Sequence, residues 1–147
     1  MVPCRARLAF FLLLPGCARG SAAERAVSPV PAACPGRDQA LERDELYFGR
    51  NRKGGPEVSD REWGEFLGRV VTPRFPAGFT VWEAQGQWRG ADGTIEEEKS
   101  KVLAIFHDSA DSSRAAVDAI VAAYRTEFRQ EAVLRARTPS CVGFGTE

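Results

Sequence analysis

The 147-residue sequence has few of the residues that support metal, nucleotide or covalent chemistry. It contains one histidine and four cysteines, and no CxxC pair is present. Zinc and other transition metals are held by clusters of Cys, His and carboxylate side chains, so the sequence predicts no metal and no other cofactor. A phosphate-binding loop is also absent, because Gly54-Gly55 is followed by Pro56 and an acid, where such a loop has a lysine and a helix start.

An excess of charge of one sign and long apolar runs are missing as well. Twenty basic and twenty acidic residues give a formal net charge of zero, which removes the electrostatic basis for binding nucleic acid. The longest apolar run, residues 8–14, is far shorter than the roughly 20 residues that a transmembrane helix needs. We therefore expect no nucleic-acid partner and no transmembrane span.

The first 17 residues have the order of a secretory signal. Arg5 and Arg7 provide a positive region, residues 8–14 an apolar region, and Pro15-Gly16-Cys17 an exit of helix-breaking and small residues. Residues 14–17 resemble a bacterial lipobox, which makes Cys17 the candidate lipidation site, although Pro15 departs from the usual residue. Ordinary cleavage within 18–23 is the alternative. The sequence predicts export to the periplasm or outer surface, with or without a lipid anchor.

Export changes the cysteine count of the mature chain. Cleavage removes Cys4, and Cys17 either carries a lipid or is removed too, which leaves Cys34 and Cys141. In an oxidising compartment such a pair, near the two ends of the domain, is typical of a disulfide. Two buried free thiols are the alternative.

Residues 18–43 are rich in Ala, Pro and Arg without periodicity, so they are predicted to form a disordered tether before one domain at 44–147. In the domain, 45–49 is a short strand. Ser59 and Glu62 form a capping box, and apolar residues from Trp63 to Val71 follow a helical period. Pro73 ends this helix, and Arg74 is expected to cap its carbonyls.

The remaining patterns complete an α+β fold. Residues 79–89 and 95–107 read as a hairpin around a Gly-containing turn. A second helix follows, with N-caps among 109–113 and an apolar stripe from Val117 to Phe128, and 132–144 is the last strand. This order predicts a ferredoxin-like βαββαβ sandwich, in which one four-stranded antiparallel sheet carries two helices on one face.

That topology places the first and third strands in the middle of the sheet. The runs 46–48 and 102–106 are continuously apolar, as in strands buried on both faces, yet the helices cover only one face. The other face is expected to be covered by a second copy in a homodimer, by a ligand, or by the arm held at Cys34. Partial shielding by long side chains such as Arg89 and Arg135 is the alternative.

A polar group is expected on that open face, where amides and guanidinium groups beside an aromatic ring could orient a small ligand. Ordinary cross-strand pairing of the same residues is the alternative. The three tryptophans, Trp63, Trp82 and Trp88, are predicted to be core residues. The candidate ligand-binding residues are Tyr47, Glu83, Gln85, Gln87, Arg89 and Arg135, with Lys101 depending on the strand register.

Six short segments together resemble a family of bacterial exported proteins, domain of unknown function 3574. The resemblance covers about residues 44–144 and implies an exported, compact α+β domain, but it implies no activity and no catalytic residues. The segments are ELYFG at 45–49, VS at 58–59 with Trp63, VTPRFPAG at 71–78, GQWR at 86–89, KSK at 99–101 and QEAVLR at 130–135.

Two functions remain after these exclusions. Since no nucleophile motif accompanies the one histidine, a non-enzymatic envelope module that binds a small ligand or another envelope protein is favoured. The alternative is a small dimeric enzyme or ligand binder of the α+β-barrel kind, with a pocket between paired sheets. For that enzyme Tyr47, His107 and Arg135 would be the acid, the base and the anion-binding group.

Overall fold

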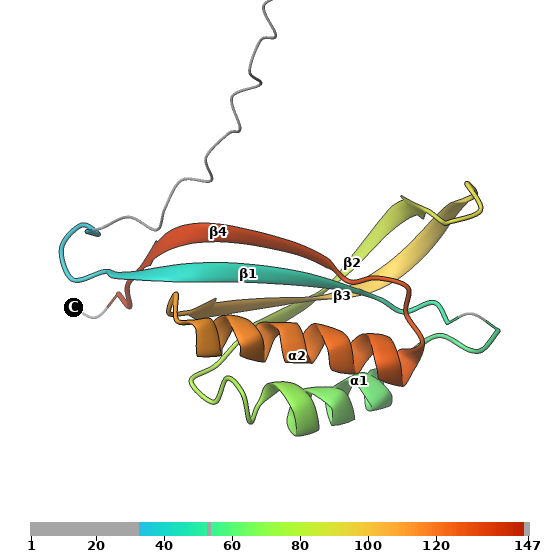
Figure 1. Ribbon diagram of the computed structural model, residues 1–147, viewed down its shortest axis with the longest axis horizontal. Helices are drawn as coiled ribbons and strands as arrows, with labels where there is room; N and C mark the ends of the chain where they lie inside the picture. Colours follow the sequence, from blue (N-terminus) through green and yellow to red (C-terminus); the bar gives the residue numbers. More distant parts are fainter. Residues whose placement is uncertain (1–32, 53, 146–147) are drawn as a thin grey trace, which may run out of the picture.

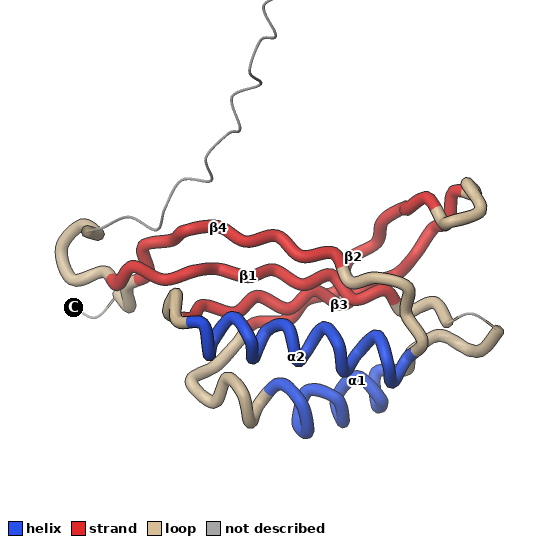
Figure 2. Tube along the Cα trace, in the orientation of Figure 1, coloured by secondary structure: helices blue, strands red, loops and turns tan. Residues whose placement is uncertain are grey.

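The computed structural model describes residues 33–52 and 54–145. Four strands form one antiparallel sheet in the order β2-β3-β1-β4, and both helices lie on the same side of it (Figures 1 and 2). This confirms the predicted ferredoxin-like fold and the central positions of β1 and β3. The elements are β1 (Gln39–Gly49), α1 (Asp60–Phe66), a π-helical turn η1 (Leu67–Val71), β2 (Thr80–Arg89), β3 (Ile95–His107), α2 (Asp111–Phe128) and β4 (Leu134–Val142).

The first helix starts at the predicted capping box. The Ser59 side chain accepts a hydrogen bond from the Glu62 N–H, and the Glu62 carboxylate accepts one from the Ser59 N–H. These bonds satisfy backbone donors that a helix start leaves without partners. At the other end, Arg74 donates to the Val70 carbonyl at 2.7 Å, as predicted. The sequence signals for this helix are therefore confirmed at both ends.

The core lies between the helices and the sheet and is built around aromatic rings. The Phe48 ring lies 4.6 Å from that of Tyr124 and 5.2 Å from that of Trp63, measured between centroids. Tyr124 also donates its hydroxyl hydrogen to the Gly49 carbonyl at 2.9 Å, so its polar end is satisfied although the residue is fully buried. Trp63 is a core residue, as predicted.

The strand registers decide which side chains face the helices. Leu46 pairs with Leu103, and both lie in the core beneath the helices, whereas their neighbours Tyr47 and Val102 pair on the opposite face, which we call the open face. In β2, Trp82 pairs with Val102 and therefore lies on the open face too. Because successive side chains of a strand alternate between faces, the other side chains follow from these pairs.

Two predictions about the tryptophans of β2 are thus wrong. Trp82 and Trp88 are not core residues: they lie on the open face and are 38% and 41% exposed. Alternation along β2 separates its residues into two sets, but nothing within the strand says which set faces the helices. The register against β3 places the polar set on the side of the sheet that carries the helices.

The start of the ordered chain also differs from the prediction. β1 begins at Gln39, so the last residues of the expected tether belong to the sheet, where Gln39 pairs with Val142. The disulfide between Cys34 and Cys141 is present, with an S–S distance of 2.03 Å, and the free-thiol alternative is wrong. The predicted signal segment, Cys17 and most of the tether lie outside the described residues. In the described part of the chain neither helix is both long and apolar enough to cross a membrane.

Candidate functional site

A pocket of about 900 Å³ lies at the end of the sheet where β1 leaves it. One wall is the tip of the β2–β3 hairpin, which extends past the helices and curves away from them (Figure 1). The opposite wall is the connection from α2 to β4, residues 129–134. Tyr47, Gly49 and Ser100 of the central strands line the pocket between these walls. The pocket is large enough for a ligand of metabolite size.

The connection that forms the second wall is fixed to the end of β1. Arg129 ends α2 in the left-handed conformation, with φ of 55°. The Gln130 side chain then donates to the Asn51 carbonyl at 2.6 Å. This hydrogen bond links the α2–β4 connection to the loop after β1 and so holds this wall of the pocket in place.

Glu98 is a half-buried acidic residue in the lining of the pocket. Its carboxylate accepts a hydrogen bond from the Asn51 N–H at 2.9 Å, and it lies against Gly49, where a β-carbon would make the Glu98 side chain move aside. Across the strand pair lies Gly86, whose missing side chain leaves open space. Burial raises the pKa of Glu98, the Asn51 hydrogen bond opposes this, and the negative charge of Glu96 raises it further.

Tyr47 lies on the open face within a row of polar residues along β1. Its hydroxyl donates to the Glu45 carboxylate at 3.0 Å, and this hydrogen bond raises the pKa of Tyr47. Glu45 also accepts a hydrogen bond from Arg43. Arg43, Glu45 and Tyr47 therefore form a polar row that runs from the middle of the open face to the pocket.

The six predicted ligand-binding residues do not share one face. Tyr47 is on the open face, whereas the strand registers place the four from β2, and Arg135, on the side that carries the helices. Tyr47, Gln87 and Arg135 line the pocket, and Gln85 lines a smaller one beside Lys99. The predicted open-face cluster is wrong because the helix-bearing side of β2 is the polar side. The residues from β2 are Glu83, Gln85, Gln87 and Arg89.

The two outer members of that set have other partners. Glu83 accepts a hydrogen bond from Lys101 at 2.5 Å, which is the cross-strand pairing given as the alternative. Arg89 donates to the Gly93 carbonyl at 2.9 Å, within the hairpin turn. Neither lines the pocket, and since Arg89 and Arg135 lie on the helix side, they do not shield the open face as the alternative required.

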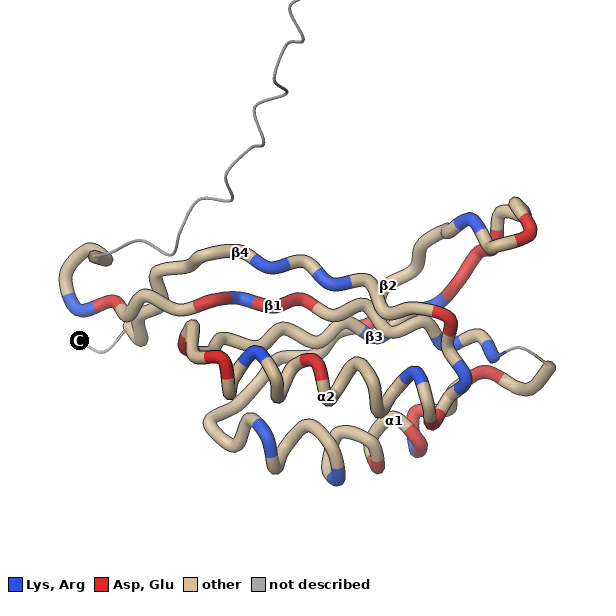
Figure 3. Tube along the Cα trace, in the orientation of Figure 1, with Lys and Arg blue, Asp and Glu red and all other residues tan. Residues whose placement is uncertain are grey.

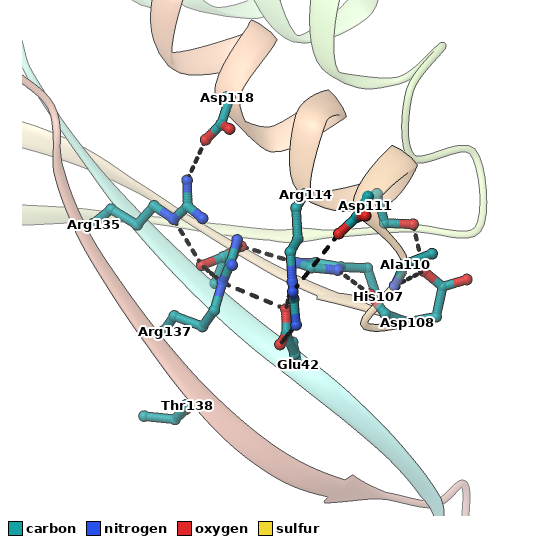
Figure 4. Close-up of polar contacts among 12 residues, drawn as sticks. Glu42, His107, Asp108, Ala110, Asp111, Arg114, Asp118, Arg135, Arg137 and Thr138 are labelled. Atoms are coloured by element: carbon teal, nitrogen blue, oxygen red, sulfur yellow. Dashed lines mark hydrogen bonds and ion pairs between the residues drawn. The ribbon is translucent and has the colours of Figure 1, made fainter. Parts of the chain in front are cut away.

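A buried charged cluster centres on Asp44, a fully buried residue on the helix side of β1. Its carboxylate accepts hydrogen bonds from Arg135 Nε at 3.1 Å, from Arg137 Nη2 at 2.8 Å and from His107 Nε2 at 2.9 Å. Figure 4 shows these three side chains converging from β3 and β4 beneath α2. In Figure 3, acidic and basic positions lie next to one another along β1, beside basic positions on β4.

The hydrogen bonds of His107 engage both of its ring nitrogens within the fold. Its Nε2 faces the Asp44 carboxylate, and its Nδ1 faces the Asp108 backbone carbonyl at 2.6 Å. Since its side chain is buried and Tyr47 is on the other face, the expected set of Tyr47, His107 and Arg135 does not assemble.

A second carboxylate, Glu42, extends the cluster toward the start of α2. Arg114 of α2 donates to it from Nε at 3.1 Å and from Nη2 at 2.5 Å. The Arg114 hydrogen bond lowers the pKa of Glu42 more than burial raises it. For Asp44 burial raises the pKa, but the hydrogen bonds from Arg137 and His107 and the charge of Arg135 together lower it below its usual value. Both groups are therefore held ionised, as partners of fixed cations.

Comparison with known families agrees with the resemblance in the sequence. The model of a family described as "Protein of unknown function (DUF3574)" matches residues 43–144. The chain belongs to this family. The matched range covers all seven elements of this DUF3574 member except the first residues of β1. No curated protein matches the sequence.

Three solved structures resemble this DUF3574 member. A phage SAM lyase in complex with S-methyl-5'-thioadenosine has a TM-score of 0.60 at 15% identity, with 73% of this chain and 88% of that chain covered. A phage SAM lyase in its apo state has a TM-score of 0.54 at 13% identity, covering 74% of this chain and 93% of that chain. CutA from Synechococcus elongatus PCC7942, complexed with Bis-Tris, has a TM-score of 0.46 at 13% identity, covering 70% and 83%. At these identities the first two show a shared fold.

The pocket residues that the sequence reasoning missed are Glu98, Ser100, Asn51 and Gln130. Glu98 is the last of three consecutive glutamates, a pattern typical of a solvent-exposed strand. The space beside its side chain exists because glycines lie next to it on both neighbouring strands. Gly49 and Gly86 inside strand patterns were the available signal. Within residues 33–52 and 54–145 no group of three or more His, Cys, Asp or Glu is arranged to hold a metal ion.

Proposed function

We propose that this chain is an exported, non-enzymatic module that binds a small molecule in the pocket between the β2–β3 hairpin and the α2–β4 connection. Export is supported by the basic and apolar segments of residues 1–17 and by the Cys34–Cys141 disulfide, which is typical of oxidising compartments. The pocket carries the binding proposal. It combines a volume of about 900 Å³, an indole ring on one wall and a half-buried carboxylate in its lining.

A binding role agrees better with the charged groups than an enzymatic one. The histidine is buried with both ring nitrogens engaged, and the Asp44 carboxylate already accepts hydrogen bonds from this histidine and from two arginines. Neither group touches the pocket. His107 and Asp44 therefore stabilise the fold beneath the helices, while the pocket offers packing and hydrogen bonds.

The proposal predicts that valine at position 86 blocks binding. A side chain there enters open space, so Gly86→Val is expected to leave the fold intact and to fill part of the pocket. Ligand-dependent melting is measured over a metabolite panel that includes nucleosides such as S-methyl-5'-thioadenosine, which a phage SAM lyase of similar fold binds. At least one compound should raise the melting temperature of the parent domain, and this rise should disappear in Gly86→Val.

The matched control is Ala84→Val, because Ala84 lies on the same face of the same strand but does not line the pocket. It should keep the ligand-induced rise. A panel without any stabilising compound, or a compound whose effect is the same in both valine variants, would contradict the proposal.

We further propose that the open face pairs with the same face of a second copy. Val102 and Ala104 form its buried centre, and beside them Trp82 and Phe106 are 38% and 43% exposed. Such a patch of large aromatic residues is typical of an interaction surface. The charges of this face suit a second copy. Arg43 and Glu45 are successive residues on the open face of the central strand, so a two-fold axis between them places Arg43 of each copy opposite Glu45 of the other. The formal net charge of zero adds no repulsion between copies.

Replacement of Phe106 by glutamate tests this dimer. The parent protein is expected to sediment as a dimer at micromolar concentration, and Phe106→Glu should weaken association by at least about tenfold, since it buries an unpaired charge in the interface. Ile95→Glu is the control, because Ile95 is 51% exposed on the other side of the hairpin. It should leave the dimer intact. A parent protein that is strictly monomeric at high micromolar concentration would overturn the proposal.

A further inference from the structure

One wall of the pocket carries an indole ring, and carboxylates lie next to it. Trp88 of β2 lines the hairpin wall with 41% of its surface exposed, although indole side chains are usually more buried. Its neighbour across the strand pair is Glu96, and one step along the same face Gly86 is paired with Glu98. The glycine therefore leaves a space bordered by the indole ring and by the Glu98 carboxylate.

Two of the arginines that line the pocket, Arg52 and Arg135, are paired with carboxylates outside it, and the third, Arg129, is exposed at the end of α2. Arg52 forms an ion pair with Glu62 at 2.6 Å and lies over the Phe128 ring, 5.1 Å from its centroid. Arg135 is held by Asp44 and Asp118. Carboxylates on the helix side of the sheet therefore neutralise the charges of Arg52 and Arg135.

Glu98 has no such compensation. No lysine or arginine among residues 33–52 and 54–145 lies within ion-pair distance of its carboxylate, and the Asn51 N–H donates a hydrogen bond to one of its oxygens. Burial raises the pKa of Glu98, as does the charge of Glu96, so the ionised form lacks a counter-charge at this position. A cationic ligand would supply it.

We infer that the pocket binds an organic cation with a flat or apolar body, such as an aromatic amine, whose charge meets the Glu98 carboxylate while its body lies against Trp88. This inference rests on the proposed function and specifies its ligand class. Three features of the geometry act together: the charge faces a half-buried acid, the indole face attracts cations, and the space beside Gly86 admits the body of the ligand.

Matched probes of equal shape test the charge requirement. The pairs are 2-phenylethylamine with 2-phenylethanol, and tryptamine with tryptophol, titrated into the full domain with its disulfide intact. Affinity is measured by calorimetry and by the backbone amide NMR shifts of the pocket residues. The amines are expected to bind at least about tenfold more tightly than the alcohols, since a charge-assisted hydrogen bond in a half-buried site contributes that much.

The variant Glu98→Gln keeps the shape of the side chain and removes its charge. It should reduce amine affinity to that of the alcohols and leave alcohol affinity unchanged. Glu97→Gln is the control, because Glu97 is adjacent on β3 but faces the other side of the sheet. Amine affinity should also fall as the pH is lowered through the raised pKa of Glu98, and this dependence should vanish in Glu98→Gln.

The outcomes separate the ligand class from the proposed function. If amines and alcohols bind alike, or if Glu98→Gln leaves the amine preference intact, the ligand class is wrong, while binding that Gly86→Val abolishes still supports the pocket. If the metabolite panel gives a hit but neither amine binds, the ligand class is again overturned. If no compound of either set binds, the proposed function fails together with the inference.

Discussion

Replacing Asp44 with alanine is expected to lower the free energy of unfolding by about 3 kcal/mol, the usual cost of removing one partner from a buried group of charges. The fully buried Asp44 carboxylate accepts hydrogen bonds from Arg135, Arg137 and His107. Without it Arg135 and Arg137 lose the buried carboxylate that they share, and His107 Nε2 loses its hydrogen-bond partner. Chemical denaturation of the parent and variant domains, with the disulfide intact in both, measures the difference.

Asp118→Ala is the matched control, because Asp118 also pairs with Arg135 but its side chain is 68% exposed. Exposed ion pairs contribute about 1 kcal/mol or less, so this variant should remain close to the parent. The ion cluster would not be a source of stability if Asp44→Ala unfolded at the same denaturant concentration as Asp118→Ala.

The same cluster predicts how stability depends on pH. The pKa of Asp44 in the folded protein lies below its ordinary value of 3.8, and that of Glu42 lies below 4.5. A carboxyl group with a lowered folded pKa binds fewer protons in the folded state, so its contribution is present above the ordinary value and is lost as the pH falls through the lowered one. Acidification below about pH 4 should therefore destabilise the parent domain more than Asp44→Asn. Equal acid sensitivity of the two would contradict this reading.

Removal of the disulfide is the second change with a large expected effect. Cys34 and Cys141 are 107 positions apart, so their bond closes a loop that contains every element of the domain up to the end of β4. Closing a loop of this length restricts the unfolded chain and stabilises the folded state by about 4 kcal/mol in the chain-entropy model. The paired substitution Cys34→Ser with Cys141→Ser is expected to cost that amount in denaturant unfolding.

Reduction provides the control for this experiment. Dithiothreitol should destabilise the parent domain to the level of the paired serine variant and should leave the variant itself unchanged. A thiol titration of the unfolded parent confirms that the bond is formed before reduction. If the serine variant lost less than about 1 kcal/mol, the entropic origin assigned to the stabilisation would be wrong.

Much of the fold could be predicted because its signals are local. The capping box at Ser59 and the stop at Pro73 bound the first helix, and both act through residues within a few positions. The start of α2 was less exact: its N-cap is Ala110, which makes no side-chain cap, while Asp108 accepts from the Ala110 N–H instead. The hairpin and the pairing of the two cysteines were also predicted correctly.

The candidate site was less predictable because it depends on pairing between strands. Alternation along β2 correctly separated the polar residues from Trp82 and Trp88, yet which set faces the helices follows from the register against β3. Once Trp82 pairs with Val102, both tryptophans lie on the open face, and the polar residues take the helix side. Glu98 could not be recognised as a pocket residue for the same reason, because the glycines beside it, Gly49 and Gly86, belong to two other strands.

The amino-acid sequence by itself determined the order of the elements, the ends of the first helix, the central positions of β1 and β3 and the partners of the disulfide. These follow from the periodicity, caps and composition of segments only a few residues long. Only the tertiary structure decided which faces are covered and which distant groups meet. Asp44 and Arg137 are 93 positions apart, and their contact exists because β1 and β4 pair in one register. A shift of that register by one residue would separate them, since it turns every side chain to the opposite face.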